Sequence, residues 1–457
     1  MRAQDRPNAP PVNSGARKPR APGLFTAIAA ALIGFGAGPA LGAPIYYDTG
    51  VHIAIPASPD NITTNGAFLS YDIMWADGGL IYLADRTNVS VDIFSAATNS
   101  FVGRIGGSGH VFVGQNPPPP AAPTTAISGP DGLVVANTAG AGHTLYVGDG
   151  DSTLKAFNLN AGGALIATVP TGTAALGKRV DEMAFSPVNN TLLVANNAAS
   201  PTPFTTLINA TNNTIVPGSK VAFAADGIEQ SVFDPLTGKF YLNVDNTGGP
   251  GSVVVVNPTT GLVEKTYDLS TVAGGPGPSG ACAPTGLAVD QGGKLLVGCG
   301  VGPSTFLLDP AANGGLGSLK AIPLTGEDMV WFDPVRKLFY VTSRNFPLGC
   351  NAALSPAAGG CTPELGIVDD FGNLVQTLAT SFGAHSIAVD PATGKAFMPY
   401  GGVGPGGAAS AAVTACPLGC VEVFALIPEP GSLALLSTGL AVFGGLGWRR
   451  RRSSLGS

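Results

Sequence analysis

Short runs of apolar residues recur through the middle of this 457-residue chain. Residues that favour turns, mainly Gly, Pro, Asp and Asn, separate these runs. No long stretch between them has the 3.6-residue period of an amphipathic helix, whereas short β-rich runs parted by turn residues are typical of strands. The pattern predicts an all-β domain, which we place at residues 44–427.

The apolar runs form a repeat that occurs seven times. Each repeat has an apolar strand that opens on a polar residue, then a turn, a second strand, a loop and a third strand. The openings are Asp72–Asp77, Asp131–Ala136, Asp181–Ser186, Glu229–Asp234, Thr285–Asp290, Asp328–Asp333 and His385–Asp390. They lie 43 to 59 residues apart, as four-stranded blades with loop insertions do. We therefore predict a seven-bladed β-propeller, with a pair of two-sheet sandwiches as the alternative.

The last repeat lacks a fourth strand. Its third strand, at Val421–Leu426, is stopped by Pro428. At the other end of the domain, Val51–Ile55 alternates like a strand and belongs to no repeat. Because a propeller with open ends would expose strand edges, we predict that this N-terminal strand closes the seventh blade.

The first 43 residues are typical of a secretory signal peptide. Basic residues precede an apolar run, Leu24–Gly38, and small residues follow at Ala40–Ala43. The apolar run is too short for a comfortable bilayer span. A buried N-terminal helix is the alternative, and the basic flank argues against it.

The last 30 residues have three parts. First, two prolines flank a glutamate, at Pro428, Glu429 and Pro430. An uncharged apolar segment follows at 433–448, and four arginines come after it, at Arg449, Arg450, Arg451 and Arg452. The apolar segment predicts one transmembrane helix, and the arginines would hold its end in the cytoplasm. An ordinary tail anchor would need no Pro-Glu-Pro.

This arrangement resembles the PEP-CTERM sorting signal of Gram-negative bacteria. The resemblance covers residues 428–457 and implies export across the inner membrane, a transient anchor there, and processing by an exosortase near Pro428. It also implies a final place at the cell surface or in the extracellular matrix, with a surface polysaccharide or protein as partner. It says nothing of the domain that precedes it.

Three local motifs resemble two families of exported propellers. Phe233–Tyr241 and Tyr340–Ser343 are similar to YVTN-type surface propellers, and Leu83–Asn88 is closer to the NHL type. Both resemblances imply a fold and no particular activity.

The six cysteines predict three local disulfides in an exported chain. The pairs are Cys282 with Cys299, Cys350 with Cys361, and Cys416 with Cys420. In the first pair, each cysteine lies eight residues from a turn at Asp290 and Gln291, so in-register pairing would set the two opposite one another. None of the six has CxxC spacing, which argues against a zinc site.

One polar position recurs at the start of the innermost strands, where side chains would converge on the channel. It is occupied by Asp72, Asp131, Asp181, Glu229, Thr285, Asp328 and His385. We call these the ring residues. Together they would form an acidic ring able to hold Ca²⁺ or a polar ligand. We favour the other interpretation, in which each side chain caps its own strand or bonds to the neighbouring blade.

Other chemistry has weaker support. Asp149–Ser152 looks like the start of a calcium loop but lacks the remaining ligands, so a turn is the better interpretation. No motif of a hydrolase, nucleotide-binding protein or zinc protease is present. Residues 44–427 carry 14 Lys and Arg against 27 Asp and Glu, a net charge of −13, which disfavours nucleic acid as a partner.

We therefore expect a non-catalytic binding scaffold at the cell surface. The alternative is a hydrolase or lyase, lactonase-like, that acts in the channel with a divalent cation.

Overall fold

A computed structural model describes residues 46–118, 124–246, 251–277, 282–302, 304–347, 349–351, 360–381, 383–402 and 416–427. The predicted signal peptide and the predicted sorting segment, including its transmembrane helix, lie outside these residues. Within the described ranges, we find no helix with the length and apolar character that a membrane span requires.

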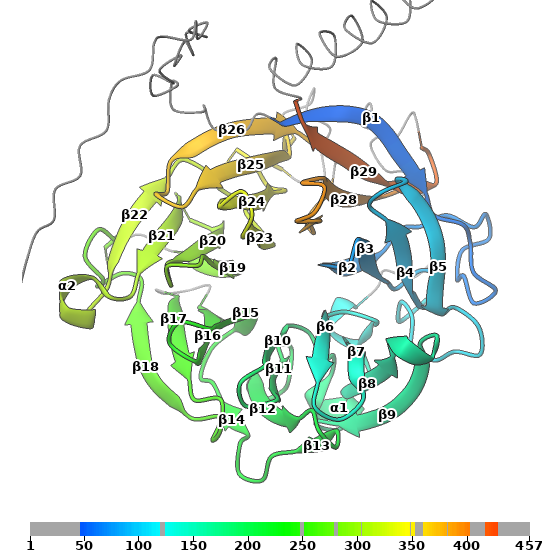
Figure 1. The fold of residues 1–457 in the computed structure, drawn as a ribbon, viewed down its shortest axis with the longest axis horizontal. Helices are drawn as coiled ribbons and strands as arrows, with labels where there is room; N and C mark the ends of the chain where they lie inside the picture. Colours follow the sequence, from blue (N-terminus) through cyan, green and yellow to red (C-terminus); the bar gives the residue numbers. More distant parts are fainter. Residues whose placement is uncertain are drawn as a thin grey trace, which may run out of the picture. The chain divides into compact units, whose positions relative to one another are not determined.

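The described strands form seven antiparallel sheets around a central axis (Figure 1). The prediction of an all-β, seven-bladed propeller is confirmed. From the axis outward, blade 1 contains β2 (Tyr71–Asp77), β3 (Leu80–Asp85), β4 (Ser90–Ser95) and β5 (Ser100–Gly106). Blade 2 contains β6 (Leu133–Thr138), β7 (Gly142–Gly148), β8 (Thr153–Asn158) and β9 (Ala164–Pro170). Blade 3 contains β10 (Met183–Ser186), β11 (Thr191–Asn196), β12 (Phe204–Asn209) and β13 (Thr214–Ile215), with β14 (Val221–Ala222) also paired to β12.

The remaining blades follow the same order. Blade 4 contains β15 (Gly227–Asp234), β16 (Lys239–Asp245), β17 (Ser252–Val256) and β18 (Val263–Asp268). Blade 5 contains β19 (Ala283–Val289), β20 (Leu295–Val301), β21 (Thr305–Asp309) and β22 (Ser318–Ile322). Blade 6 contains β23 (Val330–Asp333), β24 (Leu338–Ser343), β25 (Glu364–Asp369) and β26 (Leu374–Ala379). Blade 7 contains β27 (Ala388–Val389), β28 (Ala396–Gly401), β29 (Gly419–Leu426) and β1 (Tyr46–Ala54).

In four of the blades, an aspartate at the end of the innermost strand builds the first hairpin. Its carboxylate accepts hydrogen bonds from backbone N–H groups of the turn, as Asp234 does from Leu236 and Asp390 does from Thr393. Such an Asx-type turn holds the chain reversal without help from other elements. The recurring Asp of the repeat therefore has a structural role at this end of the strand.

The seventh blade combines the two ends of the domain. β1 pairs antiparallel with β29, with Tyr46 opposite Leu426 and Ala54 opposite Cys420. The innermost strand of this blade, β27, is only two residues long and pairs with Ala396 and Phe397. Pro399, the next residue but one along β28, has no N–H group to extend that ladder.

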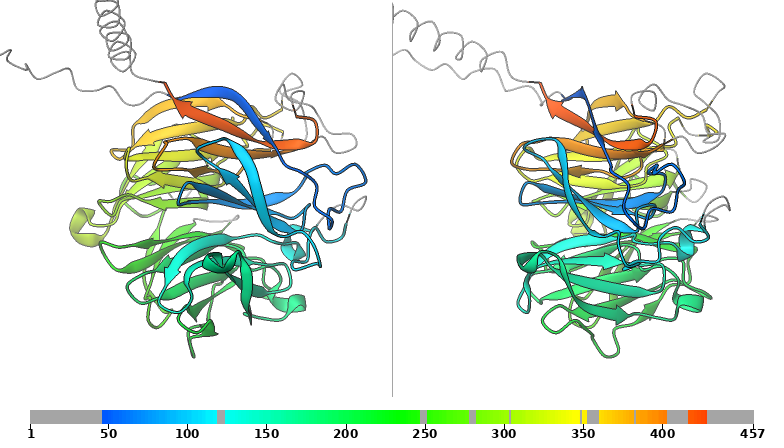
Figure 2. Two further views of the ribbon diagram at one scale, coloured as in Figure 1. Left: turned by 45° about the vertical axis from the view of Figure 1, so that its right-hand side comes forward. Right: turned by 90° about the vertical axis from the view of Figure 1, so that its right-hand side faces the viewer.

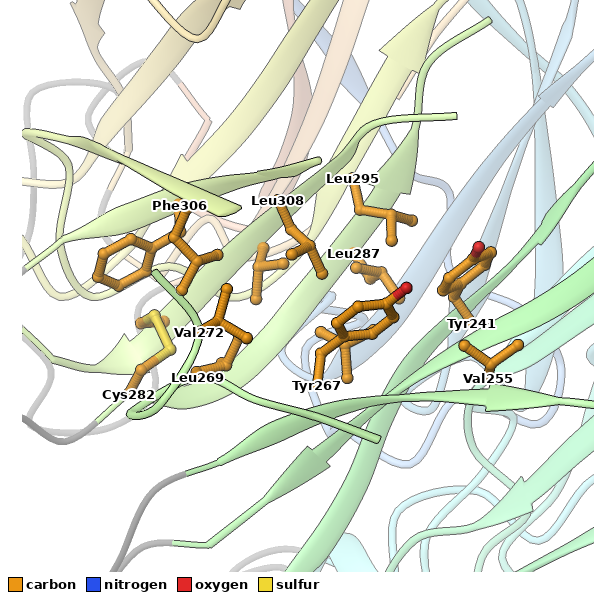
Figure 3. Packing of buried hydrophobic residues seen from close by; sticks show 14 residues of the cluster. Tyr241, Val255, Tyr267, Leu269, Val272, Cys282, Leu287, Leu295, Phe306 and Leu308 are labelled. Carbon is orange, nitrogen blue, oxygen red and sulfur yellow. A yellow bond between two sulfur atoms is a disulfide. The ribbon is translucent and has the colours of Figure 1, made fainter. Parts of the chain in front are cut away.

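Apolar side chains fill the spaces between neighbouring blades. Between blades 4 and 5, the side chains of Tyr241, Val255 and Tyr267 pack against those of Leu287 and Leu308 (Figure 3). Each sheet thus buries one apolar face against the blade before it and the other against the blade after it, as the layered packing of sheets requires.

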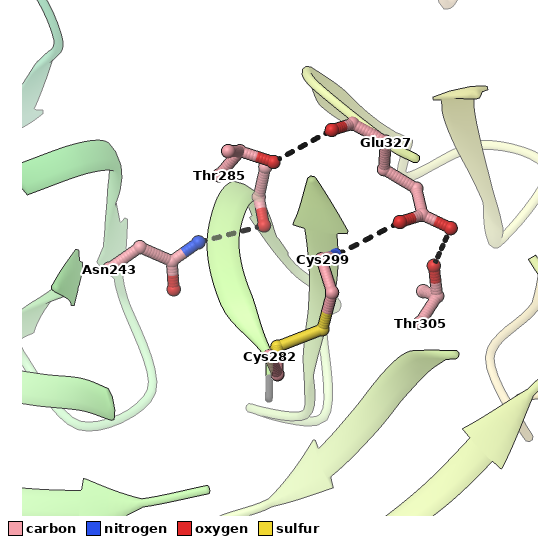
Figure 4. The surroundings of a disulfide bond; sticks show 7 residues. Asn243, Cys282, Thr285, Cys299, Thr305 and Glu327 are labelled. Carbon is pink, nitrogen blue, oxygen red and sulfur yellow. Dashed lines mark hydrogen bonds between the residues drawn. A yellow bond between two sulfur atoms is a disulfide. The ribbon is translucent and has the colours of Figure 1, made fainter. Parts of the chain in front are cut away.

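All three predicted disulfides are present, at Cys282–Cys299, Cys350–Cys361 and Cys416–Cys420. The Cα atoms of Cys282 and Cys299 lie 5.2 Å apart, within the usual range. Beside this bond, the N–H of Cys299 donates to Glu327, whose carboxylate also accepts from Thr305 (Figure 4).

The predicted register of this hairpin is wrong. Leu287 lies opposite Val297, and Cys299 lies opposite Pro284 after two irregularities in β19. The turn is longer than expected, because Asp290 accepts hydrogen bonds from the N–H groups of Gly292 and Lys294. The cysteines meet because the strand is bulged at Pro284, which has no N–H group for the ladder.

The propeller has two unlike faces. We call the face on which the innermost strands begin the mouth face, and the opposite one the tail face. The connections that begin and end at the mouth face include 55–70, 107–132, 171–182, 269–282, 344–363 and 402–418, whereas no connection that begins and ends at the tail face is longer than 310–317. Following the strand directions, Tyr46 and Ile427 both lie at the tail face (Figure 2).

We predict that replacing both Cys282 and Cys299 with Ala lowers the free energy of unfolding by about 3 kcal/mol, because the bond closes a loop with a sequence separation of 17. Urea denaturation of the exported protein measures this loss. The matched control is Cys416→Ala with Cys420→Ala, whose separation of 4 predicts a smaller loss, about 2 kcal/mol. An equal or larger loss in the control would contradict the loop-closure explanation.

Candidate functional site

The ring residues all lie at the mouth-face ends of the innermost strands. Asp72, Glu229 and Thr285 are the second or third residues of β2, β15 and β19. The other four lie two or three residues before their strands: Asp131, Asp181, Asp328 and His385. The structure joins some of these side chains and separates others.

Two arginines bring together the first three ring carboxylates. The guanidinium group of Arg86, which follows β3 and is buried, donates to both Asp72 and Asp131. Arg179 makes an ion pair of 2.6 Å with Asp181 and lies 3.9 Å from Asp72. Blades 1, 2 and 3 are therefore linked by charge at the mouth.

These charges set the protonation of the carboxylates. Burial by itself would raise the pKa of Asp72, but Arg86 and Arg179 hold it below its usual range. Burial raises the pKa of Asp131 well above its usual range in spite of Arg86, and it raises the pKa of Asp181 to about 6. Burial and the arginines thus shift the pKa values of these three carboxyl groups in different directions.

The remaining ring residues have separate partners. Asp328 pairs with Arg344 at 2.8 Å, and Glu229 accepts a hydrogen bond of 2.9 Å from Asn197. Thr285 donates to the backbone oxygen of Glu327, away from the ring carboxylates. These contacts agree with the interpretation in which ring side chains bond within or between blades.

The seventh ring residue, His385, is held in a polar and aromatic setting. Its ring stacks on Tyr71 at 4.4 Å between centroids, and its Nδ1 lies 2.8 Å from the backbone oxygen of Gly383. Burial lowers the pKa of His385, so the imidazole is neutral at physiological pH.

The arrangement gives no support to a metal site. Among the described residues, we find no group of three or more His, Cys, Asp or Glu side chains placed to hold a metal ion. Arg86 already contacts two of the carboxylates that such an ion would need. The segment from Asp149 to Ser152 is a turn between β7 and β8, and Lys155 pairs with Asp149 there.

Sequence reasoning missed the partners of the ring. Arg86, Asn197 and Arg344 each follow the second strand of their blade, so aligning the second runs as well as the first would have revealed them. Arg179 and Glu182, next to Asp181, lie outside any recurring position of charge. Arg179 acts across blades, since it lies 3.9 Å from Asp72, and one repeat alone does not show such a contact.

An apolar cavity of about 490 Å³ lies along the axis. It is lined by the innermost strands of blades 1 to 6, with Trp75, Phe185 and Phe233 among the wall residues. Exposed prolines such as Pro187 also line it, so the cavity extends to the tail face. The structure therefore has a charged mouth at one end of the axis and an apolar cavity toward the other.

Solved structures that share this fold include the following three. Hydrazine synthase of Kuenenia stuttgartiensis matches with a TM-score of 0.52 and 14% identity, over 78% of this chain and 96% of that one. A streptogramin B lyase matches at 0.54 and 11%, over 84% and 98%. Raptor of Chaetomium thermophilum matches at 0.53 and 12%, over 85% of this chain and 29% of that one. At these identities the likeness is one of fold alone.

The C-terminal end has a more specific match. No curated protein matches the chain. Residues 426–452 match the PEP-CTERM protein-sorting motif, which indicates export and exosortase-dependent sorting to the surface of a Gram-negative bacterium. The chain is therefore a seven-bladed β-propeller, of a fold shared with streptogramin B lyase, that carries a PEP-CTERM sorting motif.

Proposed function

We propose that this protein is a surface or matrix propeller that binds a polysaccharide or protein through its mouth face, without catalysis. The observation that supports this most is the separation of the two faces. The long connections gather on the mouth face, whereas Ile427, to which the sorting segment is attached, lies at the tail face. Loops on a rigid scaffold are where binding residues concentrate.

The tether would keep the mouth face clear. Only five residues, 428–432, separate Ile427 from the apolar segment, and they span at most about 17 Å when fully extended. While the predicted transmembrane helix anchors the chain, the tail face is held toward the bilayer. Loops on the mouth face then point away from the membrane.

The state of the mouth favours binding over catalysis. A general acid or base needs a group free to exchange a proton with a substrate. Asp72, Asp131 and Asp181 are instead held by arginines, and the half-buried His385 stacks on Tyr71. The hydrolase or lyase alternative is supported only by the fold that this chain shares with streptogramin B lyase.

We expect the exported protein to bind extracellular polysaccharide from the cells that make it, and to leave that polysaccharide uncut. Leu176→Ser should weaken binding severalfold, because Leu176 is an exposed apolar side chain on a mouth-face connection. Leu236→Ser, at a similarly exposed tail-face turn, is the matched control. Co-sedimentation measures the binding, and an assay for new sugar ends measures cleavage.

Two results would contradict this proposal. Equal loss in both variants would remove the assignment to the mouth face. Release of new reducing or unsaturated ends would favour the hydrolase or lyase alternative.

We also propose that the mature chain begins near Ala43 and ends near Pro428. Replacing Pro428, Glu429 and Pro430 with Ala should leave the uncut protein in the inner membrane, because the exosortase would no longer recognise it. Fractionation and mass spectrometry of the protein detect this outcome. Ser453→Ala with Ser454→Ala, in the same tail but beyond the matched residues, should be sorted normally. Surface protein that still contains Arg449–Arg452 would argue against processing.

We further propose that β1 keeps the ring closed. Tyr46, its first residue, reaches beyond its own blade: its hydroxyl lies 2.6 Å from that of Tyr340, and its backbone N–H and C=O both bond to Gln376 of blade 6. These contacts join blade 6 to the seam, by which we mean the pairing of β1 with β29 in blade 7.

Tyr46→Phe should lower the free energy of unfolding by about 1–2 kcal/mol, because the buried oxygen of Gly394 loses the donor at 2.7 Å that now satisfies it. Tyr47→Phe, one residue along and exposed, should change it by less than about 0.5 kcal/mol. Urea denaturation of the two variants compares them. Equal stabilities would mean that Tyr46 is not a seam contact.

A further inference from the structure

The axial cavity has an aromatic wall. Five half-buried rings line it, contributed by blades 1, 3, 4 and 6: Trp75, Phe185, Phe233, Trp331 and Phe332. Trp75 of blade 1 and Trp331 of blade 6 meet edge to face, with ring centroids 5.3 Å apart. Faces of aromatic rings carry partial negative charge and attract cations as well as apolar groups.

The polar groups of the cavity are few and unequal. The side-chain amide of Gln230 already has hydrogen-bond partners. Its oxygen accepts from the N–H groups of Leu287 and Val330, and its nitrogen donates to the backbone oxygen of Val330. In contrast, the hydroxyl of Ser231 is buried and has no hydrogen-bond partner among the described residues. The carboxylate of Glu182 likewise has no hydrogen bond or ion pair within the described part of the chain.

Burial and neighbouring carboxylates dominate the surroundings of Glu182. Burial raises its pKa well above the usual range, and the nearby carboxylates of Asp181 and Asp72 raise it further, as do those of Glu229 and Asp328. The arginines of the mouth are engaged with other carboxylates. A cation that entered the cavity could therefore pair with Glu182, which lies at the mouth-face end of the aromatic wall.

We propose that the cavity binds an organic ammonium ion on an apolar body. Glu182 and Ser231 would take the ammonium group, and the aromatic rings would enclose the apolar body. The volume, about 490 Å³, is that of a small-molecule pocket. The ligand would lie in the axial cavity and not on the mouth-face connections, although Glu182 stands at the end of one of them. The two proposals can fail independently, because amine binding tests this one and polysaccharide binding tests the other.

Tryptophan fluorescence reports on this site alone once one residue is changed. The chain has three tryptophans, and two of them, Trp75 and Trp331, line the cavity. Trp448→Phe removes the third. The full chain with this substitution would be titrated with 3-phenylpropylammonium and with 3-phenylpropanol, a neutral molecule of nearly the same shape.

We expect the ammonium compound to bind at least about tenfold more tightly than the alcohol. Glu182→Gln should abolish this preference while keeping the shape of the side chain. Glu422→Gln, a buried carboxyl in blade 7 that does not line the cavity, should preserve it. Equal affinities in the unsubstituted cavity, or no fluorescence change at about 10 mM of either compound, would overturn the proposal even if Glu182→Gln fails to fold.

An ethanolamine lipid presents the same chemistry as a soluble amine, and the cavity extends to the face from which the sorting segment departs. Vesicles of phosphatidylethanolamine and of phosphatidylglycerol distinguish the two sources. A fluorescence shift with phosphatidylethanolamine vesicles, and none with phosphatidylglycerol vesicles, assigns the lipid headgroup as the ligand. A shift with the free amine and with neither vesicle assigns a soluble ligand.

Discussion

The structure depends on the burial of two apolar faces per blade. A four-stranded sheet of this kind cannot cover either face by itself, so every blade needs a neighbour on both sides. In this chain the clusters between blades contain the largest side chains, such as Phe240 and Phe339, with no exposed surface. A ring is the arrangement in which no blade has an uncovered face. The pairing of β1 with β29 places the two ends of the propeller domain in one such blade.

Ring geometry in turn creates the electrostatic problem at the mouth. Seven equivalent positions converge where the innermost strands begin, and five of them carry a carboxyl group. Like charges brought together in a buried setting raise one another's pKa. Arg86, Arg179 and Arg344 offset this repulsion, although burial still raises the pKa of Asp131 beside Arg86.

The sequence predicted what repeats and missed what does not. Seven similar openings were enough to predict the blades, because period and alternation report directly on strands. The disulfide between Cys282 and Cys299 was also predicted, although its register was not, since a bulge at Pro284 depends on a missing N–H and a turn length that spacing does not reveal. Pairs such as Arg179 with Asp72 join blades 3 and 1, and no local pattern links them.

The cavity could not be predicted, for a different reason. It exists because side chains at the axis differ in size from blade to blade: Trp75 and Trp331 span toward each other, whereas Ala184 and Ala288 at the equivalent positions leave space. An exact repeat of large residues would fill the axis, and an exact repeat of small ones would leave an open channel. The departures from the repeat, not the repeat itself, therefore create the room in which Glu182 stands without a partner. In a symmetric fold, chemistry is to be sought where the symmetry of the sequence breaks.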